Sequence, residues 1–84
     1  MSYFVYLLIS KDKNKTISYV GYSNNLTKRI LLHNNNKGAK FTRGRKWKII
    51  YKKKYATKSI AMKQEYILKK NYYLRNKIKE GNKF

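Results

Sequence analysis

The sequence predicts an α+β domain in which a small three-stranded antiparallel sheet is flanked by helices. Two segments rich in aromatic and β-branched residues lie near the N-terminus with a short polar stretch between them, which is typical of a hairpin. A third such segment follows in mid-chain, and three further segments have apolar residues at helical spacing. No internal repeat is visible, and residues 1–84 are expected to form a single domain because so short a chain supports only one small core.

The hairpin is predicted from the first 22 residues. "YFVYLLIS" indicates a largely buried strand over Tyr3–Ile9, "KDKNK" indicates a turn, and "TISYVGY" indicates a second strand over Thr16–Tyr22. Gly21 lies near the end of the second strand, where a glycine indicates either a bulge or the close approach of another backbone or a ligand.

The first helix follows directly, from about Leu26 to Asn35, with an N-cap at Ser23, Asn24 or Asn25. The next stretch, "NNNKGAKFTRGRK", has two glycines and no periodicity, so we expect a loop over Asn34–Lys46 that is long for this domain and therefore of functional interest.

The C-terminal half is predicted to supply the last strand and two helices. "WKIIYKKKY" indicates a strand over Trp47–Tyr55. Thr57 or Ser59 can cap a helix from about Ser59 to Lys70, and a final helix over Tyr72–Lys79 is expected to end at Gly81.

The charge balance favours a polyanionic partner. The chain has 22 Lys and Arg against 3 Asp and Glu, a net charge of +19 that is spread along its whole length. Such a field favours nucleic acid through counterion release, although an acidic membrane surface or ribosomal RNA would satisfy it too. No apolar run approaches the roughly 20 residues of a membrane span, and no signal peptide is apparent, so we expect a cytoplasmic protein. There is no cysteine, which excludes disulfides and thiolate metal ligands.

The scarcity of acids narrows the possible chemistry. Asp12 lies in the polar turn and Glu80 in the C-terminal tail, so any carboxylate-dependent chemistry falls to Glu65. Ala61 and Leu68 are four residues before it and three after it, which directs Glu65 toward the sheet. A carboxylate there must pair with a cation or bind a metal, and both possibilities are open. One carboxylate with several waters suits Mg²⁺.

Arg29 and His33 are spaced to project from one helix face. Arg29 can hold a phosphate with its planar fork, and His33 can orient or protonate an oxygen. The alternatives are a solvated cation and an ordinary residue at a helix end. Because most cations here are Lys, the four Arg positions, which include Arg75, are favoured for phosphate contact.

Two tyrosines are candidates for the same site. Tyr6 and Tyr19 lie on the two strands of the hairpin, where both hydroxyls can reach one place beside Gly21. A tyrosine whose pKa is lowered by cations can act as a general base. Packing of both rings in the core is the alternative.

Together, these elements resemble the GIY-YIG nuclease domain family over about Tyr3 to Tyr73. "FVY" at Phe4–Tyr6 is similar to the first family motif and "YVG" at Tyr19–Gly21 to the second, while "SIAMKQEYILKK" carries the glutamate. Arg29 matches the family arginine, and His33 matches a histidine found in several branches. "GAKFTRGRKW" resembles the loop of small stand-alone bacterial members and of the catalytic subunit of the structure-specific resolvase.

The resemblance implies a metal-dependent endonuclease that hydrolyses DNA phosphodiester bonds with one Mg²⁺ or Mn²⁺ ion, with structure-selective or weak sequence specificity. Glu65 would ligate the ion, Tyr19 would be the general base, and Tyr6 would position the water or the scissile phosphate. Arg29 would stabilise the developing charge, assisted by His33. We expect further nucleic-acid contacts from Lys28, Lys40, Thr42, Arg43 and Arg45.

Two departures from the family pattern stand out. Phe4 replaces the first glycine of the first motif, and neither Asn71 nor Asn76 clearly matches an asparagine that larger members carry after the glutamate. The sequence shows no additional DNA-recognition domain of the kind that larger relatives have, so we do not expect tight sequence specificity from this chain alone; an accessory protein could supply it. The alternative function is a basic nucleic-acid-binding module, for DNA or RNA, that keeps the fold without catalysis.

Overall fold

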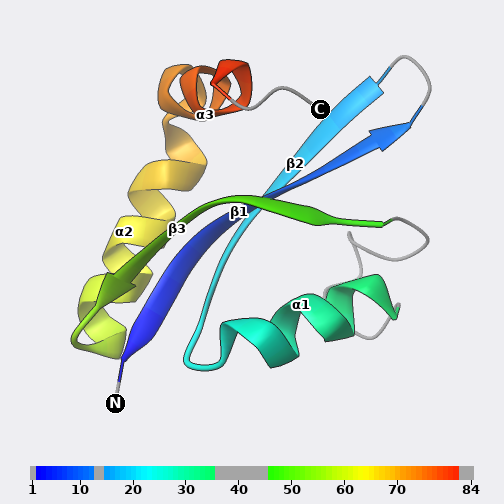
Figure 1. The fold of residues 1–84 in the computed structure, drawn as a ribbon. Coiled ribbons are helices and arrows are strands. Elements are labelled where there is room, and N and C mark those ends of the chain that lie inside the picture. Colours follow the sequence, from blue (N-terminus) through cyan, green and yellow to red (C-terminus); the bar gives the residue numbers. More distant parts are fainter. Residues whose placement is uncertain (1, 13–14, 36–45, 82–84) are drawn as a thin grey trace.

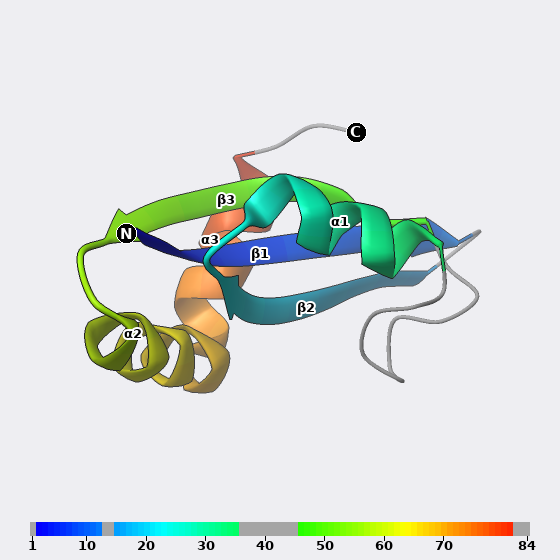
Figure 2. The same ribbon diagram turned by 90° about the horizontal axis from the view of Figure 1, so that it is seen from below.

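A three-stranded antiparallel sheet lies at the centre of the structure, with helices on both of its faces (Figures 1 and 2). The computed structural model describes residues 2–12, 15–35 and 46–81. Its elements are, in chain order, β1 (Tyr3–Asp12), β2 (Lys15–Ser23), α1 (Leu26–Asn34), β3 (Lys48–Tyr55), α2 (Lys58–Lys70) and α3 (Tyr72–Glu80). This order confirms the predicted α+β class and the predicted succession of elements.

The central strand is β1, which pairs antiparallel with β2 on one side and β3 on the other. Every side chain from Val5 to Ser10 is buried, because both faces of this strand are covered. The register with β2 places Tyr6 opposite Gly21 and Leu8 opposite Tyr19. Since paired residues share a face of the sheet, these four residues belong to one face.

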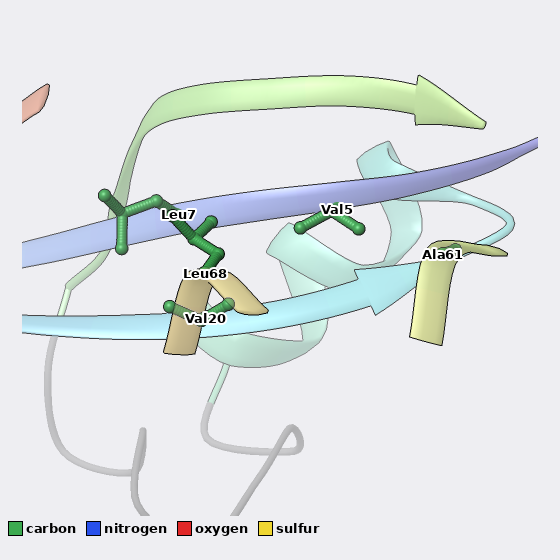
Figure 3. Close-up of a cluster of buried hydrophobic side chains, with 5 residues drawn as sticks. All are labelled: Val5, Leu7, Val20, Ala61 and Leu68. Atoms are coloured by element: carbon green, nitrogen blue, oxygen red, sulfur yellow. The ribbon is translucent and has the colours of Figure 1, made fainter. Parts of the chain in front are cut away.

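The two faces of the sheet carry separate hydrophobic clusters. On one face, Val5 and Leu7 of β1 pack with Val20 of β2 and with Ala61 and Leu68 of α2 (Figure 3). On the other face, Tyr6 and Leu8 pack with Trp47, and residues of α1 cover them. Helix α1 therefore lies over the face that carries Tyr6, and α2 lies over the opposite face (Figure 2).

Polar side chains define where the helices begin. The side chain of Asn25 accepts a hydrogen bond from the backbone of Lys28 at the start of α1, and Thr57 does the same for Ile60 in α2. Asn71 separates α2 from α3 and accepts from the backbone N–H of Leu74. The structure thus selects Asn25 and Thr57 from the alternatives that the sequence offered, as expected for residues that satisfy otherwise unpaired helix N–H groups.

The hairpin strands are longer than predicted and enter the segment assigned to the turn. β1 continues through Asp12 and β2 begins at Lys15. These two residues form the last pair of the antiparallel ladder. Gly21 is not a bulge, since its pairing with Tyr6 is in register. The irregularity of the sheet lies between β1 and β3, where the register shifts between Leu7 and Leu8.

Asn34, which we assigned to the loop as well as to the helix, is the last residue of α1. Its amide oxygen accepts from the backbone N–H of Trp47 at 2.6 Å, and its amide nitrogen donates to the carbonyl of the same residue at 3.3 Å. This side chain therefore joins the end of α1 to the start of β3. The predicted loop residues 36–45 lie outside the described ranges.

No helix in residues 2–12, 15–35 and 46–81 is long and apolar enough to cross a membrane.

Candidate functional site

Tyr6 and His33 form a buried polar pair between β1 and α1. Neither residue exposes any surface (0% each), and the Tyr6 hydroxyl lies 3.0 Å from Nε2 of His33. Tyr6 is directed toward α1 by the alternation of the strand, and His33 points back from the last turn of that helix. Each of these buried polar groups therefore has a hydrogen-bond partner in the other, as buried polar groups in proteins generally do.

Tyr19 lies on the same face, one strand away. Its ring meets the imidazole of His33 edge-on with centroids 5.1 Å apart, and it meets Trp47 in a similar arrangement at 6.3 Å. Tyr19 is half-buried, so its ring is fixed by aromatic contacts without being enclosed. Both strand tyrosines thus contact the same histidine.

Gly21 owes its identity to the Tyr6 side chain. A β-carbon at this position would lie 2.5 Å from the Tyr6 hydroxyl and 2.7 Å from the ring carbon that bears it. It would also lie 3.1 Å from the Tyr19 ring. We expected a ligand or another backbone to approach Gly21, but the residue that approaches is the tyrosine paired with it.

Arg29 lies one helical turn before His33, and its guanidinium interacts with the phenols of both Tyr6 and Tyr19. The interaction with Tyr6 is the main reason that the pKa of Arg29 is raised above its ordinary value, so the group stays charged. The Nε atom of Arg29 is buried and has no hydrogen-bond partner within the part of the chain that the structure describes. An unpaired guanidinium N–H beside two phenols is suited to an anionic ligand.

The pKa values of the buried pair are shifted in opposite directions. Burial raises the pKa of Tyr6 above its usual value, and smaller charge effects from Tyr19 and Glu65 act in the same direction, while Arg29 partly counteracts them. Burial, followed by the positive charge of Arg29, lowers the pKa of His33. At neutral pH a neutral phenol therefore faces a neutral imidazole. The pKa of Tyr6 is raised, so Tyr6 is not a tyrosine whose pKa cations have lowered for general-base catalysis.

Glu65 lies on α2, which packs against the face of the sheet opposite α1. Its side chain is 18% exposed, and its carboxylate lies 3.4 Å from the ammonium of Lys69, which is 56% exposed and one turn further along the helix. Its charge also acts on the Tyr6 phenol, which places it in the electrostatic surroundings of the site. The ion pair with Lys69 is one of the two possibilities that the sequence left open, and metal binding by Glu65 stays a prediction.

The described residues offer no multi-carboxylate cluster to a metal, and Glu65 is the acidic candidate that the sequence singled out. No three His, Asp or Glu side chains gather within residues 2–12, 15–35 and 46–81. Glu65 is partly exposed, and its ion pair is with Lys69, a solvent-facing lysine on the same helix, so its oxygens remain accessible to an ion. This donor set fits a single hard cation that keeps most of its waters, and it does not fit a multi-carboxylate site.

Of the other predicted residues, the structure describes only those outside the loop. Lys28 is exposed on α1 beside Arg29, and Lys40, Thr42, Arg43 and Arg45 lie outside the described residues. Arg75 donates from α3 to the Ser18 hydroxyl of β2 at 3.3 Å and lies over the Tyr72 ring, so it ties α3 to the sheet. The side chain of Asn71 is used as the cap of α3.

Sequence reasoning missed two positions next to Arg29. Tyr22 and Lys58 line the same hollow as Arg29, although they lie on different elements. Tyr22 is part of the "YVGY" stretch and Lys58 directly follows the Thr57 cap, but neither position has a local pattern that indicates the other.

The chain is similar to one protein family and to several bacterial proteins. The model of the GIY-YIG catalytic domain matches residues 2–79. A UPF0213 protein of Oceanobacillus iheyensis is 44% identical over 68 residues, covering 80% of this chain and 76% of the relative. A UPF0213 protein of Bacillus licheniformis is 39% identical over 87 residues, covering 95% and 87% respectively. One from Clostridium perfringens is 46% identical over 68 residues, covering 80% and 70%. No solved structure gave a significant match.

Proposed function

Because this chain belongs to the GIY-YIG catalytic domain family, we propose that it is a metal-dependent endonuclease that hydrolyses DNA phosphodiester bonds. One observation carries this proposal. Tyr6, Tyr19, Arg29 and His33 converge on one face of the sheet, and the charge of Glu65 reaches the Tyr6 phenol from a helix more than thirty residues away in sequence. Ordinary packing does not require a half-buried arginine between two phenols in a domain this small.

Glu65 would hold one divalent cation, Mg²⁺ or Mn²⁺, with water completing the coordination. When bound, such an ion supplies Lewis acidity toward phosphoryl oxygens and lowers the pKa of bound water. The single available carboxylate and its partial exposure support one ion over two.

The roles of the other residues follow from their exposure and contacts. Tyr19, half-buried and held by His33 and Trp47, would accept the proton of the attacking water at its phenol oxygen while its own hydroxyl proton passes to solvent. Arg29 would stabilise the charge that develops on the phosphoryl oxygens, using the N–H that has no partner among the described residues. Tyr6 and His33 are fully buried and would act as positioning residues, with the Tyr6 oxygen orienting the guanidinium and His33 fixing the Tyr6 hydroxyl.

The substitution Glu65→Gln tests this function because it keeps the size of the side chain and removes its charge. We expect cleavage of a panel of branched, nicked, single-stranded and duplex DNA to be abolished in Mg²⁺, with DNA affinity nearly unchanged. Glu80→Gln makes the same chemical change at an exposed position at the end of α3 and should leave cleavage intact. Equal cleavage by Glu65→Gln and the parent, in preparations freed of contaminating nuclease, would refute the proposal.

The net charge of +19 supports the alternative of a basic module that binds nucleic acid without cleaving it. The same panel separates the two functions. Salt-dependent binding with no product from any substrate, in either Mg²⁺ or Mn²⁺, would establish the binding module. Competition between DNA and RNA of equal length would then identify the preferred nucleic acid.

A further inference from the structure

A hollow of about 370 Å³ adjoins the tyrosine–arginine cluster. Its lining residues come from segments far apart in sequence: the start of β1, the end of β2, the link into α1, α1 itself and the first turn of α2. They are Tyr3, Tyr22, Ser23, Asn24, Arg29 and Lys58. Figure 1 shows the corresponding ends of β1, β2, α1 and α2 on the same side of the molecule, near the N-terminus.

The charge of this hollow suits an anion. Two of its lining side chains, Arg29 and Lys58, are cations on different helices, and none is a carboxylate. Its walls include Asn24, which precedes α1, and Lys58, which begins α2, and neither helix has an acidic residue in its first turn. The partial positive charge at each helix N-terminus is therefore not neutralised locally and adds to the field of the two side chains.

The remaining walls suit a nucleoside. Tyr3 and Tyr22 are partly buried and pack against the Val5 and Leu7 cluster, which fixes their rings while leaving surface toward the hollow. Ring faces beside cations are how proteins hold bases and sugars next to bound phosphates without reading sequence. The volume is at the small end of the range for ligand pockets, which suits a single nucleotide unit.

We propose that this hollow is a nucleotide subsite, in which Lys58 binds a phosphate one nucleotide away from the scissile phosphate and Tyr3 and Tyr22 contact the attached nucleoside. Arg29 borders both the hollow and the tyrosine cluster, so a strand that occupies the subsite is aligned with the catalytic side chains. The proposal deepens the nuclease function and relies on it for the identity of the neighbouring phosphate. The binding chemistry itself is a phosphorylated nucleoside, whether as a chain end or within a strand.

The probe for this subsite is thymidine 3′,5′-bisphosphate, titrated into isotope-labelled protein in EDTA at about 0.1 M salt and followed by amide shifts. EDTA prevents cleavage, so the result does not depend on catalysis. We expect saturable shifts concentrated at Tyr22, Ser23, Asn24 and Lys58, much weaker ones with thymidine or inorganic phosphate alone, and about tenfold weaker binding by Lys58→Gln. Thymidylyl-thymidine, which has only an internal diester, identifies whether the subsite takes a strand interior or requires a terminal phosphate.

Lys63→Gln is the matched control because Lys63 is exposed on α2 and is absent from the lining of the hollow. It should bind like the parent, and Lys58→Arg should restore most of the affinity that Lys58→Gln loses. Equal loss in Lys58→Gln and Lys63→Gln, or shifts spread over all basic residues, would overturn the subsite in favour of diffuse attraction. Localised binding in EDTA together with no cleavage in Mg²⁺ would refute only the nuclease function.

Discussion

At the scale of single residues, the hydrogen bond between Tyr6 and His33 explains how two polar side chains occupy a small core. Tyr6→Phe removes the hydroxyl and leaves Nε2 of His33 without this partner at a position with no exposure. We expect the free energy of unfolding to fall by about 1–3 kcal/mol and cleavage to be impaired through misplacement of Arg29. Urea denaturation measures the first effect, and Tyr66→Phe, at a 60% exposed tyrosine, is the control. Equal stability of the two variants would show that the buried hydrogen bond contributes little.

Gly21→Ala tests the same tyrosine from the opposite strand. The added methyl group would lie 2.5 Å from the Tyr6 hydroxyl, so Tyr6 or the strand must move, at a cost of about 1–3 kcal/mol. Gly81→Ala is the control, since its nearest neighbour would be 3.6 Å away in ordinary contact. Thermal unfolding should separate the two variants, and the Gly21 variant should lose activity together with Tyr6→Phe. A fully stable and active Gly21→Ala would contradict the assigned reason for the glycine.

Because of His33, we expect the free energy of unfolding to fall as the solution is acidified. Its folded-state pKa is lowered by burial and by Arg29, so the unfolded chain binds the proton more readily. The stabilisation is fully present above the ordinary histidine pKa of about 6.5 and is lost as the pH falls from there toward the lowered value. The chain has one histidine, so an NMR titration of its ring assigns the pKa without ambiguity. A ring pKa at or above 6.5, or stability that rises on acidification, would contradict this expectation.

At the scale of secondary-structure elements, the Asn34 side chain joins α1 to β3 through both polar groups of its amide. Asn34→Ala should cost about 1–2 kcal/mol, because the buried Trp47 backbone loses both of these partners. Amide exchange at Trp47 should quicken correspondingly. Asn35→Ala is the control, since Asn35 is exposed and its cap contacts are made by its backbone, which alanine retains. Unchanged exchange at Trp47 in Asn34→Ala would show that α1 is held by its apolar contacts alone.

The elements were predictable to the extent that their signals are local. Asn25 and Thr57 cap helices through hydrogen bonds to residues three positions away, so the nearby sequence indicates both of these boundaries. The convergence of Tyr6, Tyr19 and Arg29 was predictable because the hairpin and the following helix are consecutive. The bonds of Asn34 to Trp47 and the placement of Lys58 beside Arg29 depend on how the elements pack in three dimensions, and no periodicity encodes them.

At the scale of the whole molecule, the charge distribution opposes folding and favours binding. Three acidic residues cannot pair with 22 cations, so most cations repel one another across a domain with a radius of gyration of 12.4 Å, comparable to the screening length at moderate salt. The same cations attract phosphates and release counterions from DNA. Stability and affinity should therefore respond to salt in opposite directions.

Raising NaCl from about 20 mM to about 0.3 M should increase the melting temperature by several degrees, because screening that contributes about 1 kcal/mol raises the Tm of a domain this size by roughly 4–8 °C. Over the same range, DNA affinity should fall with a slope of about 0.9 log units per phosphate contact per decade of salt. Lys58→Gln should reduce that slope by about one contact, whereas Lys63→Gln, at an exposed position outside the hollow, should leave it unchanged. Sucrose at equal osmolarity, which screens no charge, controls for general solute effects. A melting temperature that does not change with salt would contradict this expectation. It would mean that repulsion among the cations is already weak in water without added salt, so that the basic surface favours binding without destabilising the fold.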